Sequence, residues 1–171
     1  MAVLTLLRHA KAAQAVPGQE DFDRPLTERG RTDAAWAGKI IAPFRPDLAL
    51  VSASERTSET WEIASQALSK APDLALERGL YLCSPAQLLR RIQAVPATVR
   101  SVVAVGHNPC MEEFALWLTA GETGPEALMM REKFPTAAIA VFDLRDGSWS
   151  RLGPESVAFR RFTTPKMDAE G

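Results

Sequence analysis

VLTLLRH, residues 3–9, is the stretch that decides the fold. Its first five residues are apolar or β-branched without interruption, a pattern typical of a strand buried on both faces of a sheet. Arg8 and His9, which can both take part in chemistry, follow the apolar run directly. We therefore predict a central strand whose carboxyl end presents a guanidinium and an imidazole.

Further along the chain, short apolar runs alternate with amphipathic segments, as is typical of a layered α/β domain. We predict a three-layer α/β/α fold with a central, mostly parallel mixed sheet. Residues 1–171 are expected to form one domain, and residues 163–171 to be a frayed tail. The expected strands are residues 3–7, 47–52, 74–77, 102–105, 137–144 and 149–152, the last two joined by a turn at Asp146-Gly147; the expected helices begin at Thr27, Ser54, Ser84-Pro85 and Pro109.

The composition excludes several classes of protein. The chain has 171 residues, 46% of them hydrophobic, which suffices for the core of one domain. Its net charge is −1, whereas a nucleic-acid-binding protein would normally show a basic excess. The apolar N-terminal run is too short for a signal peptide or a membrane span, so we expect a cytoplasmic protein without a membrane partner. A monomer is the default expectation. Cys83 and Cys110 could form one disulfide but have no metal-site spacing, and we expect both to be reduced.

Charged and polar side chains follow three of the expected strands. The chain has two histidines, His9 and His107, and each comes directly after a buried strand, while Arg56 follows residues 47–52. Ligands of open α/β sheets bind beyond the carboxyl ends of the strands, so these side chains should converge there. Two guanidiniums and two imidazoles suit a phosphoryl group. Each histidine alone could instead be structural, and a metal site is disfavoured because the arginines would repel a cation.

The segments that carry these residues resemble the histidine phosphatase superfamily, in particular its small SixA-type branch. LLRHAK (residues 6–11) resembles the family's Arg-His-Gly motif, with Ala10 in place of the glycine. The other three matching segments occur in the family's order, and they are FDRPLTERG (residues 22–30), VSASERTSET (residues 51–60) and AVGHNP (residues 104–109). The resemblance implies a phosphoglycerate mutase-like fold and a phosphatase that needs no metal or other cofactor.

By this resemblance, His9 is the nucleophile that becomes phosphorylated, and Arg8, Arg56 and His107 complete the phosphate pocket. His9 must attack as a neutral ring, so its other nitrogen is expected to donate to a carbonyl. A protonated His107 is expected to add positive charge to the pocket. Asn108 is expected to shape the loop and the helix start rather than to bind phosphate.

A general acid for the leaving group is harder to find. The larger branches of the family supply a glutamate from an inserted segment, but the corresponding stretch here, residues 76–89, is short. Glu77 is interpreted as structural, and Asp23 as a weak candidate for the acid. Without an acid, the substrate should carry an activated leaving group, such as the imidazole of a phosphohistidine on a protein.

Two other functions remain open at this stage. One is a broad or small-molecule phosphomonoesterase, and the other is a phosphate-binding or phosphoprotein-binding module without catalysis. Residues 121–136 could pack on the core or could form a flap beside the site. The sequence therefore predicts a phosphatase with either a phosphorylated protein or a small phosphorylated molecule as its substrate.

Overall fold

A mixed six-stranded sheet forms the centre of the molecule in the computed structural model, which describes residues 1–171. The strand order is β3-β2-β4-β1-β5-β6. β1 (Ala2–Arg8) is a central strand, and β4 (Ser101–Gly106), β2 (Leu48–Ser52) and β3 (Asp73–Glu77) continue from it in parallel. On its other side, β5 (Ile139–Leu144) pairs antiparallel with β1, and β6 (Val157–Thr163) antiparallel with β5.

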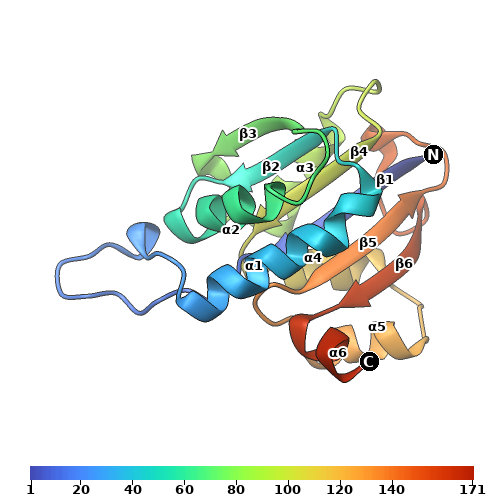
Figure 1. Cartoon of the computed structure of the whole chain (residues 1–171). Helices are drawn as coiled ribbons and strands as arrows, with labels where there is room; N and C mark the ends of the chain where they lie inside the picture. The colour runs from blue at the N-terminus through green and yellow to red at the C-terminus, as the bar shows by residue number, and fades with distance from the viewer.

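Helices cover both faces of this sheet (Figure 1). α1 (Glu28–Ile41) and α2 (Glu55–Ser65) pack on one face, over a core that includes Leu7 and Val105. α3 (Pro85–Gln93) and α4 (Cys110–Leu118) pack on the other face, over a larger core that includes Leu6 and Ala104. Neighbouring strand residues thus point into opposite cores, as expected for strands buried on both faces. The predicted three-layer α/β/α fold is confirmed.

The helix starts follow the local chemistry of the sequence. The Thr27 side chain accepts from the backbone N–H of Gly30 at 3.0 Å and caps α1. Ser84 and Gln87 form a reciprocal capping box at the start of α3. α1 and α2 approach so closely at Gly38 that a Cβ there would lie 2.2 Å from the carbonyl oxygen of Ala64. A glycine is therefore required at this helix crossing.

The prediction of a strand at residues 149–152 is wrong. Trp149–Arg151 form one turn of 3-10 helix instead, and the buried Trp149 donates its indole N–H to the carbonyl of Val99 at 2.7 Å. The strand that follows β5 and pairs with its outer edge is β6, which begins at Val157. Trp149 thus contributes apolar surface to the core from a connecting loop, which the local sequence pattern does not distinguish from a strand.

The expectation of a frayed tail over residues 163–171 also needs correction. Thr163 is the last residue of β6, and Pro165–Glu170 form α6 beside α1. Thr164 caps α6 by accepting from the backbone N–H of Met167, and Asp168 accepts from the indole N–H of Trp36 at 2.9 Å. The tail is held by a contact with a residue far away in the sequence.

The segment at residues 121–136 contains α5 (Pro125–Glu132), which packs against β6. Met130 and Phe134 are buried in the larger core, so the packing role expected of this segment accounts for them. None of the helices combines the length and the hydropathy that crossing a membrane would need.

Candidate active site

The carboxyl ends of three adjacent parallel strands bring the predicted residues together. Arg8 is the last residue of β1 and His9 follows it, while His107 follows the last residue of β4. Arg56 lies in the first turn of α2, just after β2. The rings of His9 and His107 have their centroids 5.3 Å apart. This edge of the sheet is where the loop between β1 and α1 extends, at the left of Figure 1.

The environment of His9 favours a neutral ring with a free Nε2. Its Nδ1 lies 2.7 Å from the carbonyl oxygen of Ala10, which can only accept a hydrogen bond, so Nδ1 carries the hydrogen. Burial lowers the pKa of His9 to about 4, and the nearby charges of Arg8 and Arg56 act in the same direction. Near neutral pH, Nε2 therefore has a lone pair available for nucleophilic attack.

His107 is also neutral in the absence of a bound anion, contrary to the expectation of a protonated ring. Burial lowers its pKa to about 3, with further contributions from His9 and Arg56. Its Nε2 lies 2.8 Å from the hydroxyl oxygen of Ser52, whereas its Nδ1 is buried without a partner. If the Ser52 hydroxyl donates to Nε2, Nδ1 carries the hydrogen, and a neutral ring can still donate to an anion. The positive charge of the pocket then comes from the two arginines.

Arg8 and Arg56 are each held through part of the guanidinium, and both leave Nε without a hydrogen-bond partner. Arg8 Nη1 donates to the carbonyl of Phe134 at 3.1 Å. Arg56 donates from Nη1 to the carbonyl of Asp21 at 2.8 Å and from Nη2 to its carboxylate at 3.1 Å. In both side chains Nε is buried without a hydrogen-bond partner.

Three buried nitrogens without partners therefore belong to three of the four predicted pocket residues. They are Nε of Arg8, Nε of Arg56 and Nδ1 of His107, and no other buried side-chain nitrogen or oxygen in the structure lacks a partner. Buried donors are nearly always satisfied, because leaving one unpaired costs about 1–3 kcal/mol. The arrangement is suited to an anion that would accept from all three.

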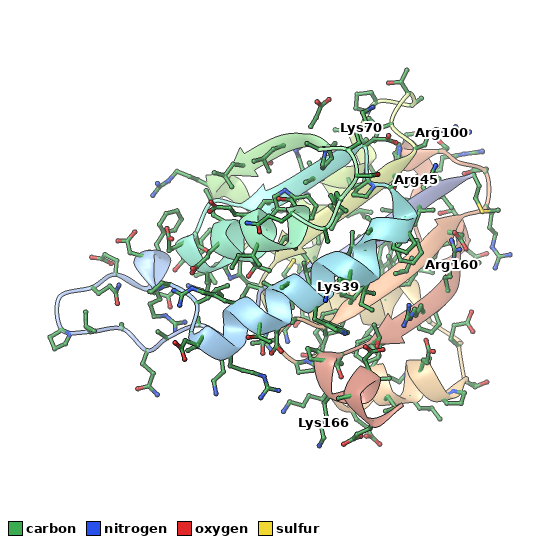
Figure 2. All side chains as sticks on the ribbon, viewed as in Figure 1. Lys39, Arg45, Lys70, Arg100, Arg160 and Lys166 are labelled. Carbon is green, nitrogen blue, oxygen red and sulfur yellow. The ribbon has the colours of Figure 1, made fainter.

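Several other basic side chains of the protein lie away from the candidate site. The labelled side chains Arg45, Lys70, Arg100 and Arg160 lie toward the opposite end of the sheet (Figure 2). A cavity of about 700 Å³ at that end is lined by Arg45 and Lys70, and it includes none of the four pocket residues. We place the candidate site at the carboxyl ends of the strands because the unpartnered donors lie there.

The other residues singled out in the sequence have structural contacts. Asn108 donates to the carbonyl of Phe134 at 2.9 Å and accepts from the backbone N–H of Glu112, so it shapes the loop. Glu77 pairs with Arg91 at 2.7 Å, as its structural interpretation predicts. Asp23 is exposed in the short 3-10 turn Asp21–Asp23, and its carboxylate has no partner there.

The segment around His9 also accommodates Ala10, the departure from the Arg-His-Gly motif that the sequence resembles. Ala10 is fully buried against Leu26, Ala34 and Ala137, so its Cβ has a packing role where the motif has glycine. Its backbone N–H donates to the hydroxyl of Thr60 at 3.0 Å, and Thr60 in turn donates to the carbonyl of Arg56. This chain of hydrogen bonds fixes β1 relative to α2.

Three residues near the pocket were not found from the sequence. Ser52 contacts His107, and Asp21 accepts from both Arg56 and the hydroxyl of Tyr81. The Tyr81 ring lies edge-on to His107, with the centroids 5.4 Å apart. Asp21 lies in an acidic loop without periodicity, so no signal distinguishes it from Asp23; Ser52, at the end of a predicted strand, could have been found from the same strand-end argument as the arginines.

Comparisons with known proteins identify the family. Residues 4–80 match the model of the histidine phosphatase superfamily (branch 1). The uncharacterized protein Rv1276c of Mycobacterium tuberculosis is 33% identical over 162 residues, which span 94% of this chain and 100% of that protein. The chain belongs to the histidine phosphatase superfamily.

Solved structures identify the branch. A protein of Agrobacterium tumefaciens assigned as the phosphohistidine phosphatase SixA is 31% identical, with a TM-score of 0.79 over 96% of this chain and 98% of that one. A protein of Nakamurella multipartita with the same assignment is 26% identical, with a TM-score of 0.82 over 96% of each chain. This histidine phosphatase is therefore a hydrolase of the SixA type.

Proposed function

We propose that this histidine phosphatase hydrolyses phosphohistidine on a protein, or a similarly activated phosphate, through a phosphorylated His9. One observation carries the proposal: three buried nitrogens without partners belong to Arg8, Arg56 and His107, at the same strand ends as His9, whose Nδ1 is engaged by a carbonyl so that Nε2 is free. Donors that are already in position where charge develops are the main source of catalysis in such sites. The pocket residues are thus His9, Arg8, Arg56 and His107.

In the first step, the lone pair of His9 Nε2 attacks phosphorus, and the bond from phosphorus to the leaving group breaks. The leaving group takes the bonding electron pair. The phosphorylated ring becomes an imidazolium whose Nδ1–H remains hydrogen-bonded to the carbonyl of Ala10. Arg8, Arg56 and His107 donate to the phosphoryl oxygens and hold the group in line with Nε2.

In the second step, water attacks phosphorus and the bond between phosphorus and Nε2 breaks. Nε2 recovers its electron pair, and His9 returns to the neutral ring with its hydrogen on Nδ1. One proton of the water remains on the phosphate or passes to solvent. Because the phosphorylated ring is cationic, it leaves as a neutral imidazole without an added proton.

The carboxylates around the pocket support an activated substrate. Glu77 is engaged by Arg91, and Asp23 has no contact with the pocket residues. The Tyr81 hydroxyl and Arg56 hold the pKa of Asp21 down to about 2, so its carboxylate is ionised at neutral pH and has no proton to give. An alcohol leaves poorly without a proton, whereas a protonated imidazole leaves readily. The arrangement therefore favours phosphohistidine over an alkyl phosphate.

A rapid-quench experiment tests the proposal. The wild-type enzyme is mixed with a radiolabelled phosphohistidine peptide, and acid-labile label is expected on His9, with none on the His9→Ala variant. The same enzyme is then compared on an alkyl phosphate, which should be turned over far more slowly. Equal turnover of both substrates would favour a broad phosphomonoesterase, and binding of phosphate without turnover would favour a binding module; either result would contradict the proposal.

A further inference from the structure

A carboxylate lies at the rim of the phosphate pocket. The Asp21 side chain is 50% exposed, and it pairs with Arg56 at 3.1 Å and with Arg24 at 3.0 Å. Arg56, by contrast, is 4% exposed, and its Nε is buried without a partner. Asp21 is therefore the group that stands between the buried arginine and solvent.

The Asp21 carboxylate can still accept another hydrogen bond. Oδ2 accepts from Arg56 and from the hydroxyl of Tyr81, whereas Oδ1 accepts from Arg24 alone. A carboxylate has about four acceptor positions, two on each oxygen. One position on Oδ1 is thus without a partner on a side chain that is half open to solvent.

Two aromatic rings stand beside this carboxylate. Phe22 follows Asp21 in the sequence, and its ring lies perpendicular to that of Tyr81, with the centroids 5.0 Å apart. Tyr81 in turn lies edge-on to His107 in the pocket. The guanidinium of Arg78 lies 4.5 Å from the centroid of Phe22, and that of Arg56 lies 5.8 Å from the centroid of Tyr81. Each of the two rings thus already accommodates a planar cation.

We propose that Asp21, Phe22 and Tyr81 form the subsite for the leaving group, and that they select a planar leaving group that carries a proton on nitrogen, such as the imidazolium ring of phosphohistidine. This inference rests on the proposed function. A negative carboxylate beside the pocket repels a phosphate dianion, and a positive leaving group on the same substrate offsets that repulsion. The aromatic rings favour a flat cation for the same electrostatic reason.

The subsite acts without transferring a proton. The N–H of the protonated ring donates to Oδ1 of Asp21, while the other ring nitrogen is bonded to phosphorus. When the bond to phosphorus breaks, its electron pair returns to that nitrogen, and the ring leaves as neutral imidazole with its proton in place. Asp21 thus stabilises the protonated form of the substrate, which is the form that leaves readily.

Two activated substrates can distinguish the binding of the leaving group by Asp21 from the ion pair by which Asp21 holds Arg56. Phosphoimidazole has a planar leaving group whose second ring nitrogen can carry a proton, whereas p-nitrophenyl phosphate has a planar leaving group with no such nitrogen. The loss of one hydrogen bond to a charged group predicts that Asp21→Asn lowers kcat/KM for phosphoimidazole at least about tenfold more than for p-nitrophenyl phosphate. Glu20→Gln, a neighbouring exposed carboxylate without a side-chain partner, should leave both values unchanged.

The outcomes separate the subsite from the proposed function. If Asp21→Asn lowers kcat/KM by the same factor for both substrates while wild type is labelled on His9, Asp21 only supports Arg56 and the subsite is refuted. If wild type hydrolyses p-nitrophenyl phosphate but not phosphoimidazole, the proposed substrate class fails, and the subsite with it. A thermal melt of each variant excludes misfolding, and Asp21→Ala, which is expected to show the same selective loss, provides a second measurement.

Discussion

Ser52→Ala should weaken anion binding, with a loss of stability that still leaves the protein folded. Ser52 is fully buried, and its hydroxyl lies 2.8 Å from Nε2 of His107. When this hydroxyl donates to Nε2, the hydrogen of the neutral ring is held on Nδ1, which is buried without a partner. Without it, the hydrogen can move to Nε2, and Nδ1 then presents a lone pair to the anion.

The size of the effect follows from the loss of one donor. A hydrogen bond to a charged group contributes about 1.5–3 kcal/mol, so the dissociation constant for tungstate or phosphate should rise by about 10-fold to 150-fold. The unfolding free energy should fall by about 1–3 kcal/mol, because Nε2 loses its closer buried partner and keeps only the Ser54 hydroxyl at 3.5 Å. Calorimetric titration measures the first quantity, and denaturant unfolding measures the second.

Nitrogen NMR of the imidazole rings tests the tautomer directly, because the chain has only two histidines. Wild type should show both neutral rings with the hydrogen on Nδ1, and Ser52→Ala should change the pattern of His107 alone. Ser65→Ala, which removes an exposed hydrogen bond to the carbonyl of Glu62, serves as the matched control. An unchanged His107 pattern together with unchanged anion affinity in Ser52→Ala would refute the reasoning.

Three further predictions concern the pocket and the fold. Arg8→Ala and Arg56→Ala should each lower kcat by roughly a hundredfold or more, about 3 kcal/mol, as measured by single-turnover kinetics. Burial lowers the pKa of His9 to about 4 and that of His107 to about 3, from the value of 6.5 that applies in the unfolded chain. Between pH 6.5 and these values, the unfolded chain therefore binds more protons than the folded protein does. The unfolding free energy should therefore fall over that window by up to about 1.4 kcal/mol per pH unit for each ring, and denaturant titrations from pH 7 to pH 4 should show a shallower slope for His9→Asn. Gly38→Ala should destabilise the protein by about 1–3 kcal/mol in the same titration, because its Cβ would meet a backbone carbonyl of α2 that cannot retreat.

The convergence of the four candidate pocket residues could be predicted because their positions follow from where the parallel strands end. Buried apolar runs mark the strands, and parallel strands end at one edge, so Arg8, His9, Arg56 and His107 had to lie near one another. The charge state of His107 could not be predicted in the same way. It depends on burial by surrounding residues and on the nearby His9 and Arg56, which only the folded arrangement defines.

The features that the sequence did not reveal depend on contacts between distant residues. Asp21 reaches Tyr81 across 60 positions of the chain, and Asp168 reaches Trp36 across 132. The first contact builds the rim of the pocket, and the second holds α6 in place of the expected frayed tail. Trp149 was misplaced for a related reason, because it fills the core from a 3-10 turn whose partner, the carbonyl of Val99, lies 50 positions earlier.

A structure of the enzyme with vanadate tests the central claim most directly. We predict a single vanadate bonded to Nε2 of His9, with Nε of Arg8, Nε of Arg56 and Nδ1 of His107 each about 2.7–3.1 Å from its oxygens. Vanadate bound elsewhere, such as in the cavity lined by Arg45 and Lys70, with those three nitrogens still lacking partners, would contradict the account.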